Sequence, residues 1–239
     1  MDKQLHLIPP MPNSIGKLDN TFLTENSSSS FLFEPKDLVQ FETAWDWQKK
    51  CREDLLKTPS AHQGVWLLQH PSCYTIGRGG SSNNVLFDID RSPVDIFRID
   101  RGGDVTHHLP GQLVVYLVFD LRRYKKDLYL YLRQLEEVLL DLFDCLNLPG
   151  ERLNGFTGVW CKGFKVASIG VGCRRWITQH GLALNVNCDL AGFHKILPCG
   201  LNGISVGKID DWIPGIKVEE VQPLMKRCLQ KRFGLIWNN

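Results

Sequence analysis

The sequence predicts a single α/β (α+β) domain, because helical and strand patterns alternate within one continuous block. Apolar residues recur at helical spacing after Asp37, between Leu128 and Leu146, and again over Val218–Phe233. Short apolar runs typical of strands lie between these segments. The block contains no internal repeat and no second linker, so we expect one domain rather than two.

The first 34 residues differ in composition from the rest. Three prolines between positions 9 and 12 break regular structure, and Ser27–Ser30 is a polar run. The stretch has acidic residues and no arginine, whereas a transit peptide is rich in arginine and poor in acidic residues. We therefore expect a loosely ordered arm over residues 1–34 and a catalytic domain over residues 35–239.

The first half of the domain begins with a helix and continues with strands. The helix is predicted from Asp37 through Leu55. Strands are predicted over 65–70 and 73–76, followed by a loop of Gly, Ser and Asn over 77–84. Two more strands are predicted over Ile96–Ile99 and Gln112–Leu121. The second of these is almost entirely apolar, which indicates burial on both faces.

The second half contains the clearest amphipathic helix, which runs from Leu128 to Leu146 and stops before Pro149-Gly150. Strands over Gly158–Cys161, Lys165–Val171 and His180–Val186 are predicted to form an antiparallel group. A last helix over Val218–Phe233 is capped by Gly234.

Composition excludes several classes of protein. A hydrophobic fraction of 43% and a charged fraction of 23% are ordinary for a soluble globular chain. The 28 Lys+Arg and 26 Asp+Glu nearly balance, which argues against nucleic acid as a partner. The longest apolar run, Leu113–Phe119, is far too short for a membrane span, so no membrane association is expected.

Eight cysteines are spread along the chain without a Cys-x-x-Cys pair. A long chain without a secretory segment favours reduced thiols and a cytoplasmic location. No close-spaced ligand pairs suggest a metal, so we expect no metal site.

Four glycine-rich or polar clusters interrupt the apolar strands: Gly77–Gly80, Arg101–His108, Ser168–Gly170 and Gln179–Ala183. Glycine beside a strand lets a ligand approach the backbone closely. The alternative is that these glycines only form turns. None of the clusters has the spacing of a phosphate-binding or dinucleotide-binding loop.

Cys199 and Lys165 are the candidate reactive residues. Cys199 lies in Leu197-Pro198-Cys199-Gly200, where a thiolate could attack an acyl carbonyl. Most cysteines are instead small buried hydrophobes. Lys165 lies in an otherwise apolar strand, where it either points to solvent or is desolvated and exchanges protons near neutral pH. A Cys–Lys pair would serve acyl transfer, with lysine as the base.

The adjacent residues His107 and His108 point to opposite faces if they lie in a strand, so they are not expected to share a metal ion. One of them is expected to line a pocket. The basic run Arg122–Lys126 is either a solvated loop or a surface that docks an acidic protein.

Together these clusters resemble the lipoyl(octanoyl) transferases, the lipoate-protein ligase B group. The resemblance extends from about Phe41 to Gly207 and depends on an ordered series of short motifs. These are Arg101-Gly102-Gly103-x-Val105-Thr106-x-His108-x-Pro110-Gly111-Gln112, Thr157-Gly158-Val159-Trp160, Lys165-x-x-x-x-Ile169-Gly170, His180 to Asn187, Asp189-Leu190 and Pro198-Cys199-Gly200.

The resemblance implies a biotin/lipoate-protein ligase-like single domain with a mixed β-sheet flanked by helices. It implies transfer of an octanoyl group from octanoyl-acyl carrier protein, without a cofactor, to a lysine of lipoyl domains. The implied acceptors are the E2 subunits of 2-oxoacid dehydrogenases and the glycine cleavage H protein, and we expect a monomer. Cys199 would be the nucleophile and Lys165 its base. The implied substrate-binding residues are Arg101, Gly102, Gly103, Asp104, Val105, Thr106, His107, His108, Ser168, Ile169, Gly170, Gly181, Leu182 and Ala183.

The sequence departs from the family pattern beside His108. His107 stands where the family usually has Tyr, Leu109 where it has Gly, and Asp104 where Gln is common. Three rival functions are an ATP-dependent lipoate or biotin ligase of the same fold, an inactive module that binds carrier domains, and a cysteine hydrolase. The Cys199 and Lys165 motifs favour transfer over all three.

Overall fold

The computed structural model describes residues 28–197 and 205–238. The α-helices are α1 (Phe41–Lys57), α2 (Leu128–Cys145) and α3 (Val218–Phe233). The strands are β1 (Ser28–Phe33), β2 (Gln63–Leu68), β3 (Cys73–Ile76), β4 (Asp95–Arg98), β5 (Val105–His108), β6 (Gln112–Val118), β7 (Gly150–Glu151), β8 (Gly158–Cys161), β9 (Phe164–Arg174), β10 (Ile177–Asn185) and β11 (Leu235–Asn238).

The strands that the structure describes form two sheets. The large sheet has the order β11-β1-β2-β6-β10-β9-β8-β7, and the small one has the order β4-β3-β5. In the large sheet β1 is parallel to both of its neighbours, whereas the pairs from β2 to β7 are antiparallel. The large sheet is therefore mixed, and the antiparallel group predicted from the sequence is confirmed.

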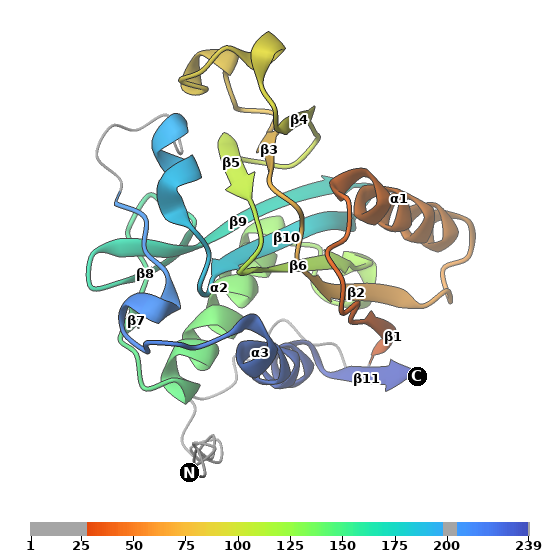
Figure 1. Ribbon diagram of the computed structural model, residues 1–239. Coiled ribbons are helices and arrows are strands. Elements are labelled where there is room, and N and C mark those ends of the chain that lie inside the picture. Colours follow the sequence, from red (N-terminus) through yellow and green to blue (C-terminus); the bar gives the residue numbers. More distant parts are fainter. Residues whose placement is uncertain (1–27, 198–204, 239) are drawn as a thin grey trace.

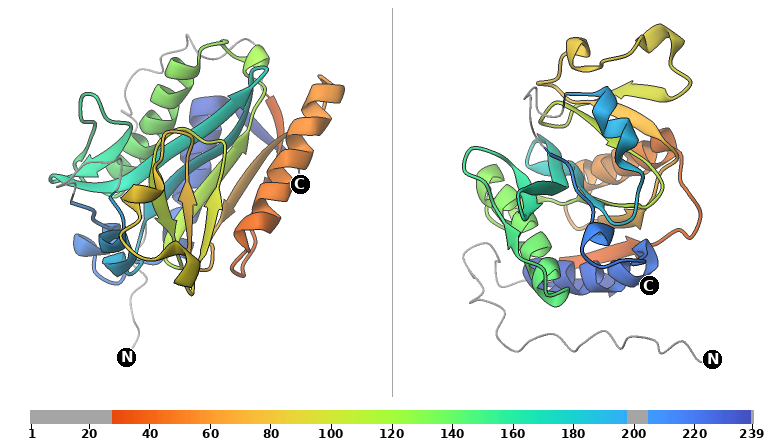
Figure 2. Two further views of the ribbon diagram at one scale, coloured as in Figure 1. Left: turned by 90° about the horizontal axis from the view of Figure 1, so that it is seen from above. Right: turned by 60° about the vertical axis from the view of Figure 1, so that its left-hand side comes forward.

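Each face of the large sheet is covered by a different layer. Helices α2 and α3 pack on one face, while α1 and the small sheet lie on the other (Figure 1 and Figure 2). Strand β6 contributes side chains to the hydrophobic cores on both faces. Leu113, Val115 and Leu117 pack in the core beneath α2 and α3. Val114 and Val118 pack in the core beneath α1. Burial on both faces explains why this strand is a continuous apolar run.

Local signals set the bounds of the helices. The side chain of Asp127 caps α2 by accepting a hydrogen bond from the Leu130 N–H at 2.9 Å. Gly234 ends α3 in the left-handed conformation, with φ of 59°, as predicted. The predicted start of α1 at Asp37 is wrong. The helix begins at Phe41, and Leu38 remains 46% exposed.

The predicted boundary at residue 34 is also wrong for the part that the structure describes. Ser28–Phe33 is not a loose arm but strand β1, which is hydrogen-bonded between β11 and β2. Phe31 packs edge-on against Trp66 with ring centroids 5.1 Å apart. The apolar part of this strand, Phe31–Phe33, is only three residues long, and pairing with the neighbouring strands extends the strand through the three serines. Residues 1–27 lie outside the described residues.

None of the helices in the two described ranges is long and apolar enough to cross a membrane. The seven cysteines in these ranges are all free thiols, and no group of His, Cys, Asp and Glu side chains there is arranged to hold a metal ion.

The position of β1 changes what truncation is expected to do. Deleting residues 1–34 removes the strand that joins β11 to β2, leaves β11 without its partner and exposes the Trp66 ring. We expect this deletion to cost on the order of 3 kcal/mol or more of the free energy of unfolding. Deleting residues 1–27 should leave the fold intact. Urea unfolding of both proteins, followed by circular dichroism, tests this, and equal midpoints would contradict it.

Candidate active site

Two adjoining cavities lie where β9 and β10 pass beneath the loop that carries Arg101. The outer cavity has a volume of about 500 Å³ and includes Lys165 in its wall. The inner chamber, of about 50 Å³, lies deeper, against β6 and the start of α1. The two share five lining residues: Arg101, Thr106, Ser168, Ile169 and Gly170.

The structure brings together almost all the residues that the sequence analysis singled out. Gly102, Gly103, Asp104 and Val105 line the outer cavity together with the shared residues and Lys165. His108, Gly181, Leu182 and Ala183 line the inner chamber. His107 lines neither cavity, and Cys199 lies outside the described residues.

The glycines of these clusters allow close packing of backbone segments. A Cβ atom at Gly77 would lie 2.4 Å from the carbonyl oxygen of Gly103, and one at Gly181 would lie 2.1 Å from that of Val115. A Cβ at Gly170 would meet the Arg101 side chain at 2.9 Å. Any side chain at these positions would displace a wall of the site, so glycine is required for close approach rather than for a turn.

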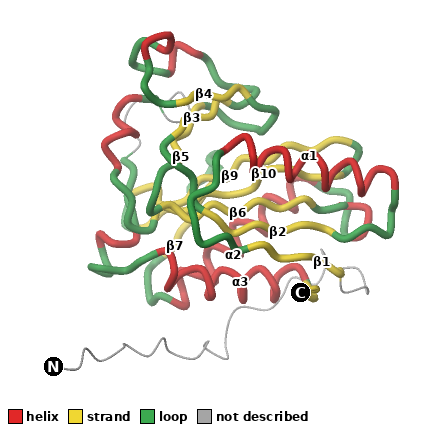
Figure 3. The backbone as a smooth tube through the Cα atoms, turned by 45° about the vertical axis from the view of Figure 1, so that its right-hand side comes forward, coloured by secondary structure: helices red, strands yellow, loops and turns green. Residues whose placement is uncertain are grey.

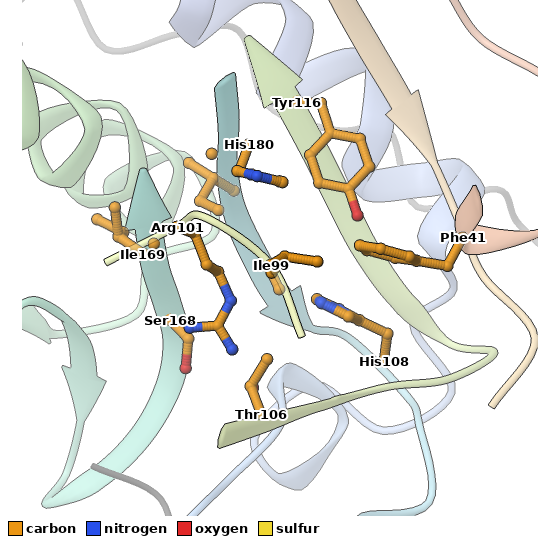
Figure 4. Close-up of a pocket in the computed structure, with 13 residues that line it drawn as sticks. Phe41, Ile99, Arg101, Thr106, His108, Tyr116, Ser168, Ile169 and His180 are labelled. Atoms are coloured by element: carbon orange, nitrogen blue, oxygen red, sulfur yellow. The ribbon is translucent and has the colours of Figure 1, made fainter. Parts of the chain in front are cut away.

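Arg101 fixes the loop between the two sheets. Its guanidinium is buried and donates hydrogen bonds to the Thr75 carbonyl at 2.7 Å and to the Thr75 hydroxyl at 3.0 Å. The Gly102 N–H donates to the carbonyl of Val171 on β9 at 2.9 Å. Figure 4 shows Arg101 and Ser168 at one end of the chamber, and the rings of Phe41, Tyr116 and His108 at the other.

A chain of side-chain hydrogen bonds connects the chamber to the strand of Lys165. The amide nitrogen of Gln112 donates to the His107 carbonyl at 3.1 Å and to Asn185 Oδ1 at 2.9 Å. Its oxygen must therefore accept the 2.8 Å bond from His108 Nδ1, which fixes the proton on that nitrogen. Asn185 in turn donates to the Gly207 carbonyl at 3.0 Å, and the Gly207 N–H donates to the Lys165 carbonyl at 3.0 Å.

His107 and His108 point to opposite faces of β5, as predicted. The His107 ring stacks on Tyr74 with centroids 4.3 Å apart and lies 2.8 Å from the Ser72 hydroxyl. A Cβ at Gly192 would lie 2.2 Å from this ring. Strand alternation thus places His107 under the short helical segment Leu190–Lys195 rather than in a cavity.

Lys165 is buried, so the alternative of a solvent-facing lysine is wrong. Only 6% of the residue is exposed, and its Nζ lies 5.0 Å from the centroid of the Trp160 ring. Its backbone N–H donates to the carbonyl of Ser205 at 2.8 Å. The chain therefore returns to Lys165 directly after residues 198–204.

His180 belongs to a cluster and a motif that the sequence analysis named, but it was not among the predicted substrate-binding residues. It lines the inner chamber in a left-handed conformation, with φ of 63°, in the middle of β10. Two contacts hold this strained backbone: the His180 N–H donates to Gln48 Oε1 at 2.7 Å, and Nε2 lies 3.0 Å from Asp100 Oδ1. The sequence signal that could have identified this residue is a histidine next to a glycine within an apolar strand.

Two of the four basic residues in the run Arg122–Lys126 have a structural explanation. Arg122 makes a bidentate ion pair with Asp120, with both nitrogen–oxygen distances at 2.7 Å. Arg123 donates to the carbonyls of Pro59 and Ala61. Lys125 and Lys126 are exposed.

Comparisons with known proteins identify the family of this chain. The sequence matches the lipoyl protein ligase A/B catalytic domain over residues 40–230. It is 62% identical over 215 residues to an octanoyltransferase of the cyanobacterium Prochlorococcus marinus, covering 90% of this chain and 96% of that one. Another octanoyltransferase, from strain MIT 9211 of the same species, is 57% identical over 235 residues, covering 98% and 100% of the two chains.

Two solved structures share the fold. Lipoate-protein ligase A bound with ATP has a TM-score of 0.67 at 16% identity, over 88% of each chain. A bipartite lipoate protein ligase from Thermoplasma acidophilum has a TM-score of 0.65 at 15% identity, over 90% of this chain and 87% of that one. This chain belongs to the lipoyl protein ligase A/B catalytic domain family, and it is an acyltransferase.

The histidines around the site predict a marked acid sensitivity. Burial lowers the pKa of both His70 and His107 to about 4, and it also lowers the pKa values of His108 and His180. In the unfolded chain these groups bind a proton below about pH 6.5, whereas the folded protein keeps them neutral. The free energy of unfolding should therefore fall as the pH decreases from about 6.5 to about 4, with uptake of about three protons on unfolding.

Urea unfolding between pH 7.5 and pH 4.5 measures this slope. His107→Gln should reduce the uptake by about one proton. A flat profile above pH 5 would contradict the prediction.

Proposed function

We propose that this enzyme transfers an octanoyl group from octanoyl-acyl carrier protein, through a thioester on Cys199, to a lysine of lipoyl domains. The observation that carries the proposal is the identity of 54% or more, over nearly the whole chain, to proteins named octanoyltransferase. The proposed acceptors are the E2 subunits of 2-oxoacid dehydrogenases and the glycine cleavage H protein. The enzyme would act as a cytoplasmic monomer without a cofactor.

The first step forms the acyl-enzyme. Lys165 takes the proton of the Cys199 thiol, and the thiolate attacks the thioester carbonyl of the donor. The bond between the carbonyl carbon and the sulfur of the carrier breaks, and that sulfur leaves with the proton returned by Lys165. The donor thioester is already activated, so no ATP is consumed.

The second step releases the product. The acceptor lysine amine attacks the carbonyl carbon of the acyl-enzyme, and the bond from that carbon to the Cys199 sulfur breaks. Lys165 accepts the proton lost by the amine and returns one to the thiolate. An amide is more stable than a thioester, so this step runs downhill.

Chain connectivity supports a pairing of Cys199 with Lys165. The Lys165 N–H is hydrogen-bonded to Ser205, and six residues of extended chain span at most about 20 Å. Phe193 and Val206, which lie on either side of the segment that contains Cys199, both line the outer cavity with Lys165. These constraints are consistent with a thiol that enters the cavity beside the lysine.

The cavity also suits a medium acyl chain. Leu128, Leu132, Phe156 and Ile169 provide apolar walls around the volume of about 500 Å³. Ligand sites of this kind are mostly apolar, with a few polar groups that fix orientation. We propose that the octanoyl chain lies along this wall, with its carbonyl end toward Lys165. Of the substrate-binding residues named from the sequence, Arg101–Thr106 and Ser168–Gly170 surround it.

The ATP-dependent ligase is the main rival, because a ligase bound with ATP shares the fold. That likeness, at 16% identity, concerns the fold alone, whereas the names of the closely similar relatives favour transfer. Isotope exchange between ATP and pyrophosphate, dependent on free lipoate or biotin, would establish the rival.

The proposal predicts that Cys199 and Lys165 act as a unit. Cys199→Ser should abolish the thioester intermediate, because a serine hydroxyl is far less ionised near neutral pH than an activated thiol. Lys165→Ala should slow acylation by about 10²- to 10⁴-fold. The two losses should not add, because without the nucleophile the base has no proton to take.

Intact mass after incubation with octanoyl-acyl carrier protein, before and after hydroxylamine, reports the intermediate, and octanoylation of a lipoyl domain reports transfer. A labile adduct on Cys73, Cys161 or Cys173 would overturn the assignment of Cys199. Full transfer by Lys165→Ala would overturn only the role of the lysine. Steady release of free octanoate without octanoylated lipoyl domain would indicate a cysteine hydrolase. The absence of both adduct and turnover would indicate an inactive module that binds carrier domains.

Donor docking is proposed to use exposed basic residues near the cavity. Lys125 and Lys126 precede Leu128, which lines the outer cavity. Acyl carrier proteins are acidic, so Lys125→Glu together with Lys126→Glu should raise the KM for the donor about five-fold and flatten its salt dependence. Lys36→Glu, at an exposed position between β1 and α1, is the control. Arg122 is unsuitable for this test because reversing its charge would break the ion pair with Asp120.

A further inference from the structure

An apolar groove of about 830 Å³, separate from the acyl site, lies between α1 and strands β1 and β2. Four aromatic rings dominate its wall: Phe31, Phe33, Trp47 and Trp66. Phe33 packs edge-on against Trp47, and Phe31 packs edge-on against Trp66, each with centroids 5.1 Å apart. We call this surface the aromatic groove.

The groove exists because α1 does not extend over the edge of the sheet. Figure 3 shows α1 above the middle strands, with β1 lying beyond it. Phe33 is consequently 44% exposed, although it belongs to a strand that has neighbours on both sides. On the same face of β11, Ile236 is 53% exposed but does not line the groove.

The sheet limits the kind of ligand that this groove can take. Strand β1 is hydrogen-bonded to β11 and to β2, so an added β-strand would find no free backbone edge there. The charged side chains in the wall, Lys50 and Asp54, are of opposite sign and favour neither an acidic nor a basic partner. An uncharged segment that binds through its side chains is the best match.

Such a segment occurs in this chain. Residues 8–12 read Ile-Pro-Pro-Met-Pro, which is uncharged and rich in proline. Proline-rich segments favour the polyproline II conformation, which needs no partner for backbone hydrogen bonds, and they bind in grooves lined by aromatic rings. Because this conformation is largely preformed, little conformational entropy is lost on binding.

The point at which the N-terminal segment joins the domain lies close to the aromatic groove, so residues 8–12 can reach it. The part of the chain that precedes the structure joins β1 at Ser28, three residues before Phe31 in the groove wall. Residues 13–27 connect the two, and 15 residues of extended chain span at most about 50 Å, which is long enough to reach the groove. Such a tether gives an effective concentration on the order of 1 mM, so a weak contact is sufficient for occupancy.

We propose that the aromatic groove binds residues 8–12 of the same chain. The contact would cover the exposed aromatic rings beside α1 and give the N-terminal segment a fixed place on the domain. It depends on neither Cys199 nor Lys165, and it does not rest on the proposed octanoyl transfer.

The full-length chain allows two tests with a matched control. Limited proteolysis should cleave the first 27 residues about ten-fold faster in Phe33→Ser than in the wild type, because the segment is released. The combined variant Pro9→Ser, Pro10→Ser and Pro12→Ser should show the same increase. Ile236→Ser removes a similarly exposed apolar side chain from the same sheet face, and its cleavage rate should match that of the wild type.

A labelled peptide of residues 1–20 provides the second readout. By fluorescence anisotropy it should bind the proline variant about ten-fold more tightly than the wild type, whose groove is already occupied. Equal cleavage rates in all four proteins, or peptide binding that Phe33→Ser does not weaken in the proline variant, would overturn the proposal. Protection that appears only at high protein concentration, together with a dimer in light scattering, would also overturn it, because the occupant would then be a second copy.

Discussion

The hydrogen bonds from His108 through Gln112 and Asn185 to Gly207 are the constraint on which the site depends. They connect β5, β6 and β10 with the chain that follows residues 198–204, so one series of side chains spans both sheets. A buried polar network of this kind is stable only when every member has a partner, because an unpaired buried group costs about 1–3 kcal/mol. Since Gln112 uses both its oxygen and its nitrogen, it also sets the tautomer of His108. One wall of the inner chamber, at His108, is thereby fixed.

Three elements far apart in the sequence meet at His180. Gln48 comes from α1, Asp100 precedes the Arg101 loop, and His180 itself lies in β10. Arg52 of α1 contacts both Gln179 and Asp100. Strained backbone persists only where surrounding contacts hold it, and here those contacts also attach α1 to the loop that lines the cavity. The left-handed backbone at His180 therefore lies at the point where α1 and the Arg101 loop are both attached to β10.

Much of the fold was predictable because it depends on apolar periodicity. The buried run of β6, the helix α2 and the cap at Gly234 all produce local signals. Strands β1 and β11 were missed because their apolar runs, Phe31–Phe33 and Leu235–Trp237, are only three residues long, and pairing with each other and with β2 completes them. The same distinction applies to the site: the glycine clusters were visible because close approach requires glycine. Phe41, Ile99 and Tyr116 also line the chamber, but their patterns match those of ordinary core positions.

The two sheets jointly determine where the proposed nucleophile can lie. The chain that leads to Cys199 is anchored to the small-sheet side, where the Leu197 N–H donates to the Asn84 carbonyl at 2.8 Å. It is anchored again at β9, where the Lys165 N–H donates to Ser205. Residues 198–204 thus bridge two anchored points that belong to different layers.

The packing between the layers consequently sets the distance that this bridge has to span. His107, although it lines neither cavity, lies on the small-sheet side, between Tyr74 of β3 and Gly192 of the segment Leu190–Lys195. Its ring supports the helical segment that runs directly into Leu197. A substitution there would move one anchor relative to the other while leaving Lys165 in place. For this reason we regard His107 as a positioning residue of the proposed thioester chemistry rather than as part of the wall that binds the acyl chain.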